Sequence, residues 1–125
     1  MENVTDFFSP KGLRTRVLVT AVAEREMDKV VNDMAILVKL EECAENGFAN
    51  YTGEWPLRPE GHGVWAFGIR KSLVRLAGYF PIADRSLFVI GGAYRKKGQE
   101  IGAKGEAVIE RVKVLKEAGV NVPQV

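Results

Sequence analysis

The sequence is nearly devoid of the residues that cross-link small proteins or bind their metals. It contains one cysteine, Cys43, and one histidine, His62, among 125 residues. A lone cysteine cannot form an intramolecular disulfide, and this pair cannot supply the ligands of a typical structural zinc site. We therefore expect no disulfide, no metal and no cofactor, and we place Cys43 in the core as a small apolar residue.

Long apolar runs and targeting signals are missing as well. No apolar run approaches the ~18 residues that a membrane-spanning helix needs. Residues 1–6 lack the basic and apolar regions of a secretory signal peptide. No repeat, low-complexity tract or long linker divides the chain, so we expect a single cytoplasmic domain over residues 1–125 with no membrane partner. Whether two tails, residues 1–12 and 119–125, are ordered or disordered is left open.

The charge is low overall but unevenly distributed. The formal net charge is +2, yet residues 1–57 carry six Lys/Arg against ten Asp/Glu, whereas residues 58–97 carry eight against two. Residues 98–125 are balanced, with four of each. An acidic half joined to a basic half is typical of a protein that binds a polyanion or an acidic protein partner. A chance unevenness of the solvated surface is the alternative.

Two periodic patterns occupy the first third of the chain. The segment from Leu13 to about Val22 alternates in character, which predicts a strand with one buried face. From about Glu24 apolar residues recur at helical spacing, and Asn46-Gly47 is a credible stop, so one helix is predicted between them. Its methionine and leucine positions are placed in the core. The apolar stripe consists of Met27, Val30, Val31, Met34, Leu37 and Val38.

The rest of the chain predicts three strands and a last helix. Residues 48–63, rich in proline and glycine, predict an irregular connection. The strand signals that follow are Val64–Arg70, Leu73–Phe80 and Ser86–Tyr94, and their short connections favour an antiparallel meander. A helix is predicted over residues 105–118, ending at Gly119. This order of elements predicts an α+β fold: a small, mostly antiparallel sheet with helices packed against it.

Cations gather at the end of the third meander strand. The segment Tyr94-Arg95-Lys96-Lys97-Gly98-Gln99 follows an apolar run, and Arg70, Lys71 and Arg75 lie on or beside the strands before it. Arginine suits phosphate because its planar fork donates two parallel hydrogen bonds and its charge survives burial. The sequence therefore predicts a surface that holds phosphate. The alternative is that these are solvated cations in turns and at strand ends.

Taken in order, these pieces resemble the RelE/HigB superfamily of toxin–antitoxin endoribonucleases, in particular its phage-derived HigB-like branch. The matching segments are Val64–Arg70 (VWAFGIR), Leu73–Tyr79 (LVRLAGY), Tyr94–Gln99 (YRKKGQ) and Glu106–Arg111 (EAVIER). Gly68 stands where the family often has glutamate. The resemblance implies a RelE-like fold. It also implies a metal-independent endoribonuclease that cleaves mRNA, usually on the ribosome, inhibits translation and is neutralised by a cognate antitoxin, a small helix-turn-helix protein.

The resemblance also implies roles for particular residues. In such enzymes the ribose 2′-hydroxyl attacks the phosphorus and the 5′-oxygen leaves, so charge must be neutralised and two protons moved. Arg70 and Arg75 are the candidate catalytic phosphate clamps, and whether they converge depends on the hairpin register. His62 is the candidate acid or base because histidine is the side-chain type whose ordinary pKa lies near neutrality, and the alternative is an incidental loop residue.

Binding residues follow from the same comparison. Lys71, Arg95, Lys96 and Lys97 are expected to hold flanking phosphates. Tyr94 or Tyr79 is expected to stack on an unpaired base, unless these rings belong to the core.

A second function belongs to a different class: a noncatalytic member of the same fold that binds nucleic acid or a protein target such as gyrase, as the resemblance implies for ParE-like relatives. Nothing after Ala118 offers an acid or a base, which favours this alternative.

Overall fold

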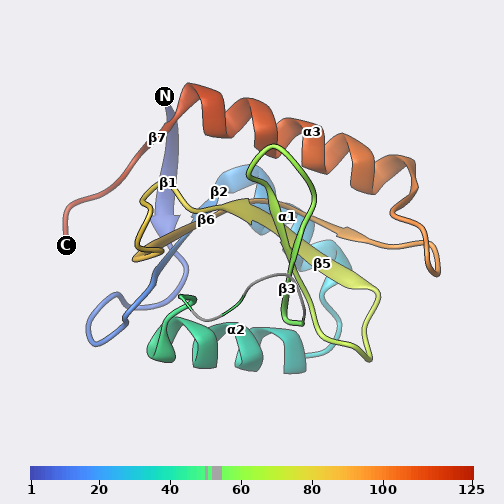
Figure 1. The fold of residues 1–125 in the computed structure, drawn as a ribbon, viewed down its shortest axis with the longest axis horizontal. Helices are drawn as coiled ribbons and strands as arrows, with labels where there is room; N and C mark the ends of the chain where they lie inside the picture. Colours follow the sequence, from blue (N-terminus) through green and yellow to red (C-terminus); the bar gives the residue numbers. More distant parts are fainter. Residues whose placement is uncertain (50, 52–54) are drawn as a thin grey trace.

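The computed structural model describes residues 1–49, 51 and 55–125, and over these residues it has three helices and a seven-stranded sheet. The elements are β1 (Glu2–Asp6), β2 (Arg16–Thr20), α1 (Ala21–Val30), α2 (Ala35–Asn46), β3 (Leu57–Pro59), β4 (Trp65–Phe67), β5 (Val74–Tyr79), β6 (Leu87–Arg95), α3 (Gly102–Ala118) and β7 (Val120–Asn121). The strand order is β3-β4-β5-β6-β2-β1-β7. Helices lie on both faces of this sheet (Figure 1).

The sheet is mixed but mostly antiparallel. Strands β3, β4, β5 and β6 pair antiparallel in succession, which confirms the predicted meander and adds a strand at its edge. Strand β2 pairs parallel with β6 and antiparallel with β1, and β7 pairs parallel with β1. The fold is therefore a mixed α/β arrangement, as predicted, on a larger sheet than the sequence indicated.

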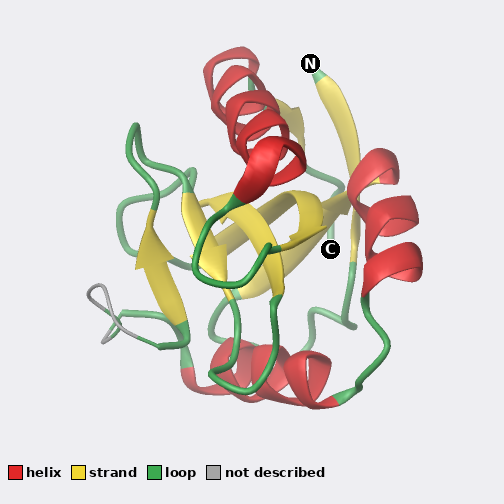
Figure 2. Ribbon diagram, turned by 90° about the vertical axis from the view of Figure 1, so that its right-hand side faces the viewer, coloured by secondary structure: helices red, strands yellow, loops and turns green. Residues whose placement is uncertain are grey.

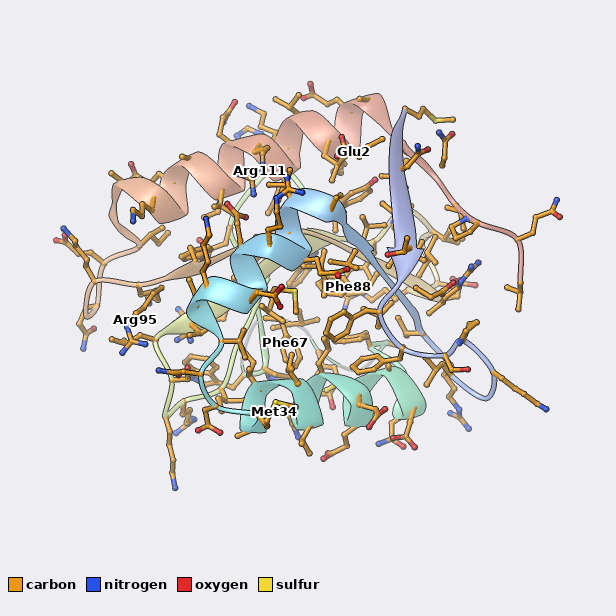
Figure 3. The ribbon with its side chains drawn as sticks, turned by 180° about the vertical axis from the view of Figure 1, so that it is seen from behind. Glu2, Met34, Phe67, Phe88, Arg95 and Arg111 are labelled. Atoms are coloured by element: carbon orange, nitrogen blue, oxygen red, sulfur yellow. The ribbon has the colours of Figure 1, made fainter. Side chains whose placement is uncertain are left out.

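Strand β6 is buried on both faces. Its residues alternate between two cores: Phe88 and Ile90 belong to one, Leu87 and Val89 to the other. Helices α1 and α2 cover the first core, and α3 covers the second (Figure 2). In Figure 3, Phe88 and Phe67 lie in the interior on the α2 side. Burial on two faces explains why the strand is a nearly continuous apolar run.

An ion pair joins α1 and α3 where β6 extends beyond the end of β2. Arg111 from α3 binds the Glu26 carboxylate from α1. Glu26 also accepts a hydrogen bond of 3.1 Å from the Ala93 amide, and Arg111 donates one of 3.1 Å to the Gly91 carbonyl. A Cβ at Gly92 would clash with Cγ1 of the buried Val108 and lie 2.6 Å from Nη2 of Arg111, so a side chain there would displace both. The pair therefore occupies backbone groups that a neighbouring strand would otherwise use.

The prediction of one helix from Glu24 to Asn46 is wrong. The chain leaves α1 at Val31, which is extended, and Asp33 then accepts a 2.9 Å hydrogen bond from the Ala35 amide where α2 begins. The break shifts the helical phase. Met34 and Val38, in the predicted apolar stripe, are 66% and 62% exposed. The buried positions of α2 are Ile36, Leu40, Cys43 and Ala44.

Several boundaries differ from the predicted ones, while two helix ends are confirmed. The strand predicted from Leu13 to about Val22 is β2, which begins at Arg16 and ends at Thr20, and β4 ends at Phe67, not Arg70. The predicted irregular connection, residues 48–63, contains β3, and its residues 50 and 52–54 lie outside the described part. Gly47 and Gly119 end their helices as predicted, each with a positive φ.

Both tails contribute strands to the sheet. Glu2 and Asn3 of β1 pair with Val120 and Asn121 of β7. Arg16 fastens this region: its guanidinium donates to both carboxylate oxygens of Asp6, at 2.7 and 2.9 Å, and to the Pro123 carbonyl at 2.7 Å. Within the described ranges, no helix combines the length and apolar character that crossing a membrane requires.

We predict that Asp6→Asn lowers the free energy of unfolding by roughly 1–2 kcal/mol, because it weakens a half-buried, charge-assisted pair. The hydrogen bond from Arg16 holds the pKa of Asp6 below its usual value. This stabilisation is present above the unfolded pKa, near 3.9, and is lost as the pH falls through the lower folded pKa. Urea denaturation should show a smaller difference in unfolding free energy between the variant and the parent protein in strong acid than at neutral pH. Glu41→Gln, on the exposed side of α2, is the control.

Candidate functional site

The candidate site is built on a cross-strand pair of polar side chains. Arg75 on β5 lies directly opposite Tyr94 on β6. Both are buried, with exposed fractions of 6% and 2%, on the sheet face that carries α3. The Tyr94 ring lies against Gly105 in the first turns of α3, where a Cβ would lie 2.8 Å from it. Two strands and a helix therefore fix these side chains before any ligand arrives.

Local contacts hold the buried guanidinium of Arg75. Its Nη1 donates to the carbonyls of Ser72 and Val74, at 2.6 and 2.8 Å, and its Cζ lies 4.4 Å from the centroid of the Trp55 ring. A Cβ at Gly68 would lie 2.7 Å from both Cδ and Nη1 of Arg75. The glycine at this position, where the resemblance leads one to expect glutamate, therefore makes room for the arginine.

A pocket of about 330 Å³ opens beside this pair. It is lined by Arg58, Pro59, Glu60, Ala66, Arg75, Tyr94, Lys96, Gln99 and Ile101. The lining comes from β3 and the residue after it, from β4, β5 and the end of β6, and from the connection to α3. Because Arg58 pairs with Ala66 across β3 and β4, the register of the edge hairpin decides that this arginine reaches the pocket.

The pocket combines three cations with one carboxylate. Burial raises the pKa of Glu60, and the charges of Arg58, Lys96 and Arg75 oppose this rise. Burial also lowers the pKa of the Arg75 guanidinium. A carboxyl group with a raised pKa beside fixed cations is a common feature of sites that bind anions or transfer protons.

Tyr94 is a hydrogen-bond donor at neutral pH. Burial and the nearby Glu60 raise its pKa to about 12, against the opposing charge of Arg75. No described residue forms a hydrogen bond with its hydroxyl, and Tyr94 lines the pocket. The hydroxyl is therefore placed to donate to a bound anion.

The amino end of α3 adds positive potential to the same place. Ile101, which lines the pocket, is the residue before the helix and gives it no side-chain cap, and the first turn contains no acidic residue. No side chain of the first turn therefore offsets the partial positive charge of the helix end. Together with Arg58, Arg75 and Lys96, it makes the pocket suitable for an anion.

Three of the sequence-predicted residues line this pocket: Arg75, Tyr94 and Lys96. The ring of Tyr94 lies in the core, so the base-stacking role predicted for it does not fit its position.

The other five predicted residues lie elsewhere. Arg70 and Lys71 are exposed in the β4–β5 turn, because β4 ends before them, so Arg70 does not join Arg75 in the pocket. Arg95 is exposed at the end of β6, as Figure 3 shows, and Lys97 is exposed in the following turn. His62 is exposed in the β3–β4 turn, with a φ of 54°.

The sequence prediction missed Arg58, Glu60 and Gln99 as site residues. Arg58 and Glu60 belong to the segment predicted as an irregular connection, so no strand or face could be assigned to them. One signal was present: residues 58–97 carry eight cations and two acidic residues, and Glu60 is one of those two.

We predict that Gly68→Ala displaces the Arg75 side chain. Overpacking at this contact should cost roughly 1–3 kcal/mol of unfolding free energy and weaken binding of inorganic phosphate. The backbone at Gly68 is outside the left-handed region, so the effect should come from the contact alone. In an Arg75→Ala background the same change should cost little. Equal costs in both backgrounds, measured by urea denaturation, would contradict this assignment.

We also predict that Glu60→Gln is at least as stable as the parent protein at neutral pH. A carboxyl group whose folded pKa is raised contributes its stability below the unfolded pKa and loses it as the pH rises through the folded pKa. Glutamine resembles the protonated form, so the variant avoids this loss. Thermal unfolding should show the advantage at about pH 7 and its disappearance below about pH 4. A variant less stable at neutral pH would mean that the surrounding cations dominate.

Comparison with known proteins finds no match. No model of a protein family matches the chain, and neither does any curated protein or solved structure. The likeness to RelE/HigB toxins therefore rests on the quoted segments of the sequence and stays a hypothesis.

Proposed function

We propose that the protein is a RelE/HigB-like toxin: a metal-independent endoribonuclease that cleaves mRNA on the ribosome and thereby inhibits translation. The observation that supports this most is the convergence of Arg58, Arg75 and Lys96 with Glu60 and Tyr94 in one pocket. Cleavage of RNA by its own 2′-hydroxyl needs cations for the phosphorus centre and groups that move two protons. All of these groups line the pocket.

The reaction assigns a role to each of these residues. Glu60 takes the proton from the 2′-hydroxyl as the oxygen attacks phosphorus, and its raised pKa suits a general base. Arg75, Arg58 and Lys96 neutralise the charge that grows on the phosphorane oxygens. Tyr94, protonated at neutral pH, donates a proton to the departing 5′-oxygen. The products are a 2′,3′-cyclic phosphate and a free 5′-hydroxyl.

Exposed cations outside the pocket extend the proposed RNA contact. The backbone amide of Lys96 bonds to the Leu73 carbonyl, at 2.8 Å, so the β4–β5 turn and the end of β6 are neighbours. Arg70 and Lys71 in that turn, with Arg95 and Lys97, form a basic margin that can hold flanking phosphates. The proposed partner that neutralises the toxin is a small helix-turn-helix antitoxin covering the pocket.

One observation favours a noncatalytic alternative. The guanidinium of Arg75 already bonds the carbonyls of Ser72 and Val74 and stacks on Trp55, which gives it a structural role without any ligand. A protein that binds nucleic acid or a target such as gyrase through this pocket, without cleavage, would require no role of Arg75 beyond this structural one.

The test is cleavage of a 5′-labelled mRNA by the purified protein in EDTA, with and without ribosomes. We expect fragments with 2′,3′-cyclic phosphate ends. Glu60→Gln should reduce the rate by about 10²–10⁴-fold, the usual contribution of a general base. Lys96→Ala should reduce it about tenfold, because one neutralising charge is lost.

Arg70→Ala is the matched control, since it removes an exposed cation outside the pocket. It should change the rate by less than about threefold while making binding less salt-dependent. If the protein does not cleave mRNA in either condition, or if Glu60→Gln cleaves at the parent rate, the proposed mechanism is wrong.

A further inference from the structure

We infer that the pocket around Arg75 and Tyr94 is selective for a doubly charged phosphate, so that it binds a phosphomonoester dianion more tightly than a phosphodiester monoanion. The inference rests on the proposed function, because it concerns the same pocket. It adds a ligand class that the proposed reaction does not require: free compounds ending in a phosphate monoester, which should occupy the pocket and block RNA.

The charges of the lining are the first support. Arg58, Arg75 and Lys96 face a single carboxylate, that of Glu60. The net charge of these four groups is +2 when Glu60 is ionised and +3 when it is protonated. A phosphodiester carries one negative charge, whereas a phosphomonoester carries nearly two at neutral pH, since its second pKa is about 6. A monoester therefore matches the pocket and a diester leaves cationic charge unbalanced.

The fixed position of the donors is the second support. Arg75 and Tyr94, with exposed fractions of 6% and 2%, are held by neighbouring strands and by contacts with Ser72, Val74 and Gly105. Because these hydrogen-bond donors are already fixed, little free energy is lost in reorganising them when an anion binds. They also act in a site from which water is largely excluded. A monoester has three terminal oxygens and a diester has two. Donors that come from several strands can therefore form more hydrogen bonds with the monoester.

The size of the pocket sets the third constraint. Its volume of about 330 Å³ is at the small end of the range for small-molecule sites, roughly 300–1,000 Å³. It can hold a phosphate with part of the attached sugar, and little more. The ligand class is therefore the phosphate end of a nucleotide or a similar small compound.

This selectivity is consistent with catalysis of RNA cleavage. The phosphorane formed during attack carries two negative charges, one more than the diester from which it forms. A pocket matched to two charges stabilises that species more than the substrate, and such differential binding is what accelerates a reaction. Glu60 then has two opposite effects: it accepts a proton in the reaction, and it repels the anion in the bound state.

The test uses two ligands that differ in one charge and cannot be cleaved: 2′-deoxyadenosine 3′-monophosphate and its methyl diester. Calorimetric titration of the full-length protein at pH 7.5 in low salt should give a Kd at least tenfold lower for the monoester. Lys96→Ala should raise that Kd about tenfold. Lys29→Ala, which removes an exposed cation of α1 on the other face of the sheet, should leave the Kd unchanged. Glu60→Gln should lower the Kd for the monoester severalfold while it slows RNA cleavage by about 10²–10⁴-fold. A purely structural role would not produce this pair of changes.

The outcomes separate this inference from the proposed function. Equal affinity for the two ligands overturns the selectivity, whether or not RNA is cleaved. An equal loss of binding in Lys29→Ala and Lys96→Ala also overturns it, because the binding would then come from general surface charge. Tight, selective binding of the monoester by a protein that does not cleave RNA supports this inference and overturns the endoribonuclease.

Discussion

The burial of β6 on both of its faces is the constraint on which the rest of the structure depends. Phe88, Ile90 and Ala93 of this strand enter the core under α1 and α2, and Leu87, Val89 and Tyr94 enter the core under α3. The strand also joins the meander to the parallel strand β2. Where β2 ends, the Glu26 and Arg111 side chains take up backbone groups of β6 and tie the two helical layers together. The end of β6, which carries Tyr94, is thereby fixed in space.

The candidate site depends on a charged group in a place where charge is costly. Burying a guanidinium is unfavourable unless hydrogen bonds and neighbouring groups compensate for the lost water. Arg75 has two carbonyl acceptors and an aromatic ring, and the space for its side chain exists because residue 68 is glycine. The same burial raises the pKa of both Glu60 and Tyr94. A pocket of this kind is pre-organised for an anion.

The elements that the sequence predicted correctly are those whose signals are local. In α3, Val108, Val112 and Leu115 are buried and Ile109 is half-buried, at the helical spacing that predicted this helix, and the glycine that follows the helix ends it. The strands of the meander pair as their turns indicated. The break between α1 and α2 was missed because Met34 and Val38 continue the apolar spacing of α1. The buried phase of α2 is instead set by packing against the sheet, which leaves both side chains exposed.

The sequence by itself determined that the basic residues gather in the middle third of the chain and that several adjoin strands of one meander. It also placed Arg75 and Tyr94 in predicted strands, as candidates to bind phosphate and an unpaired base. Only the tertiary structure decided which cations share a pocket. That choice depends on the register of β3 on β4 and of β5 on β6, and a shift of one residue would turn each side chain to the other face. These pairings are contacts between segments distant in the chain, so they leave little trace in local periodicity. Arg58 and Glu60 enter the site through them, and Arg70 is left in the turn.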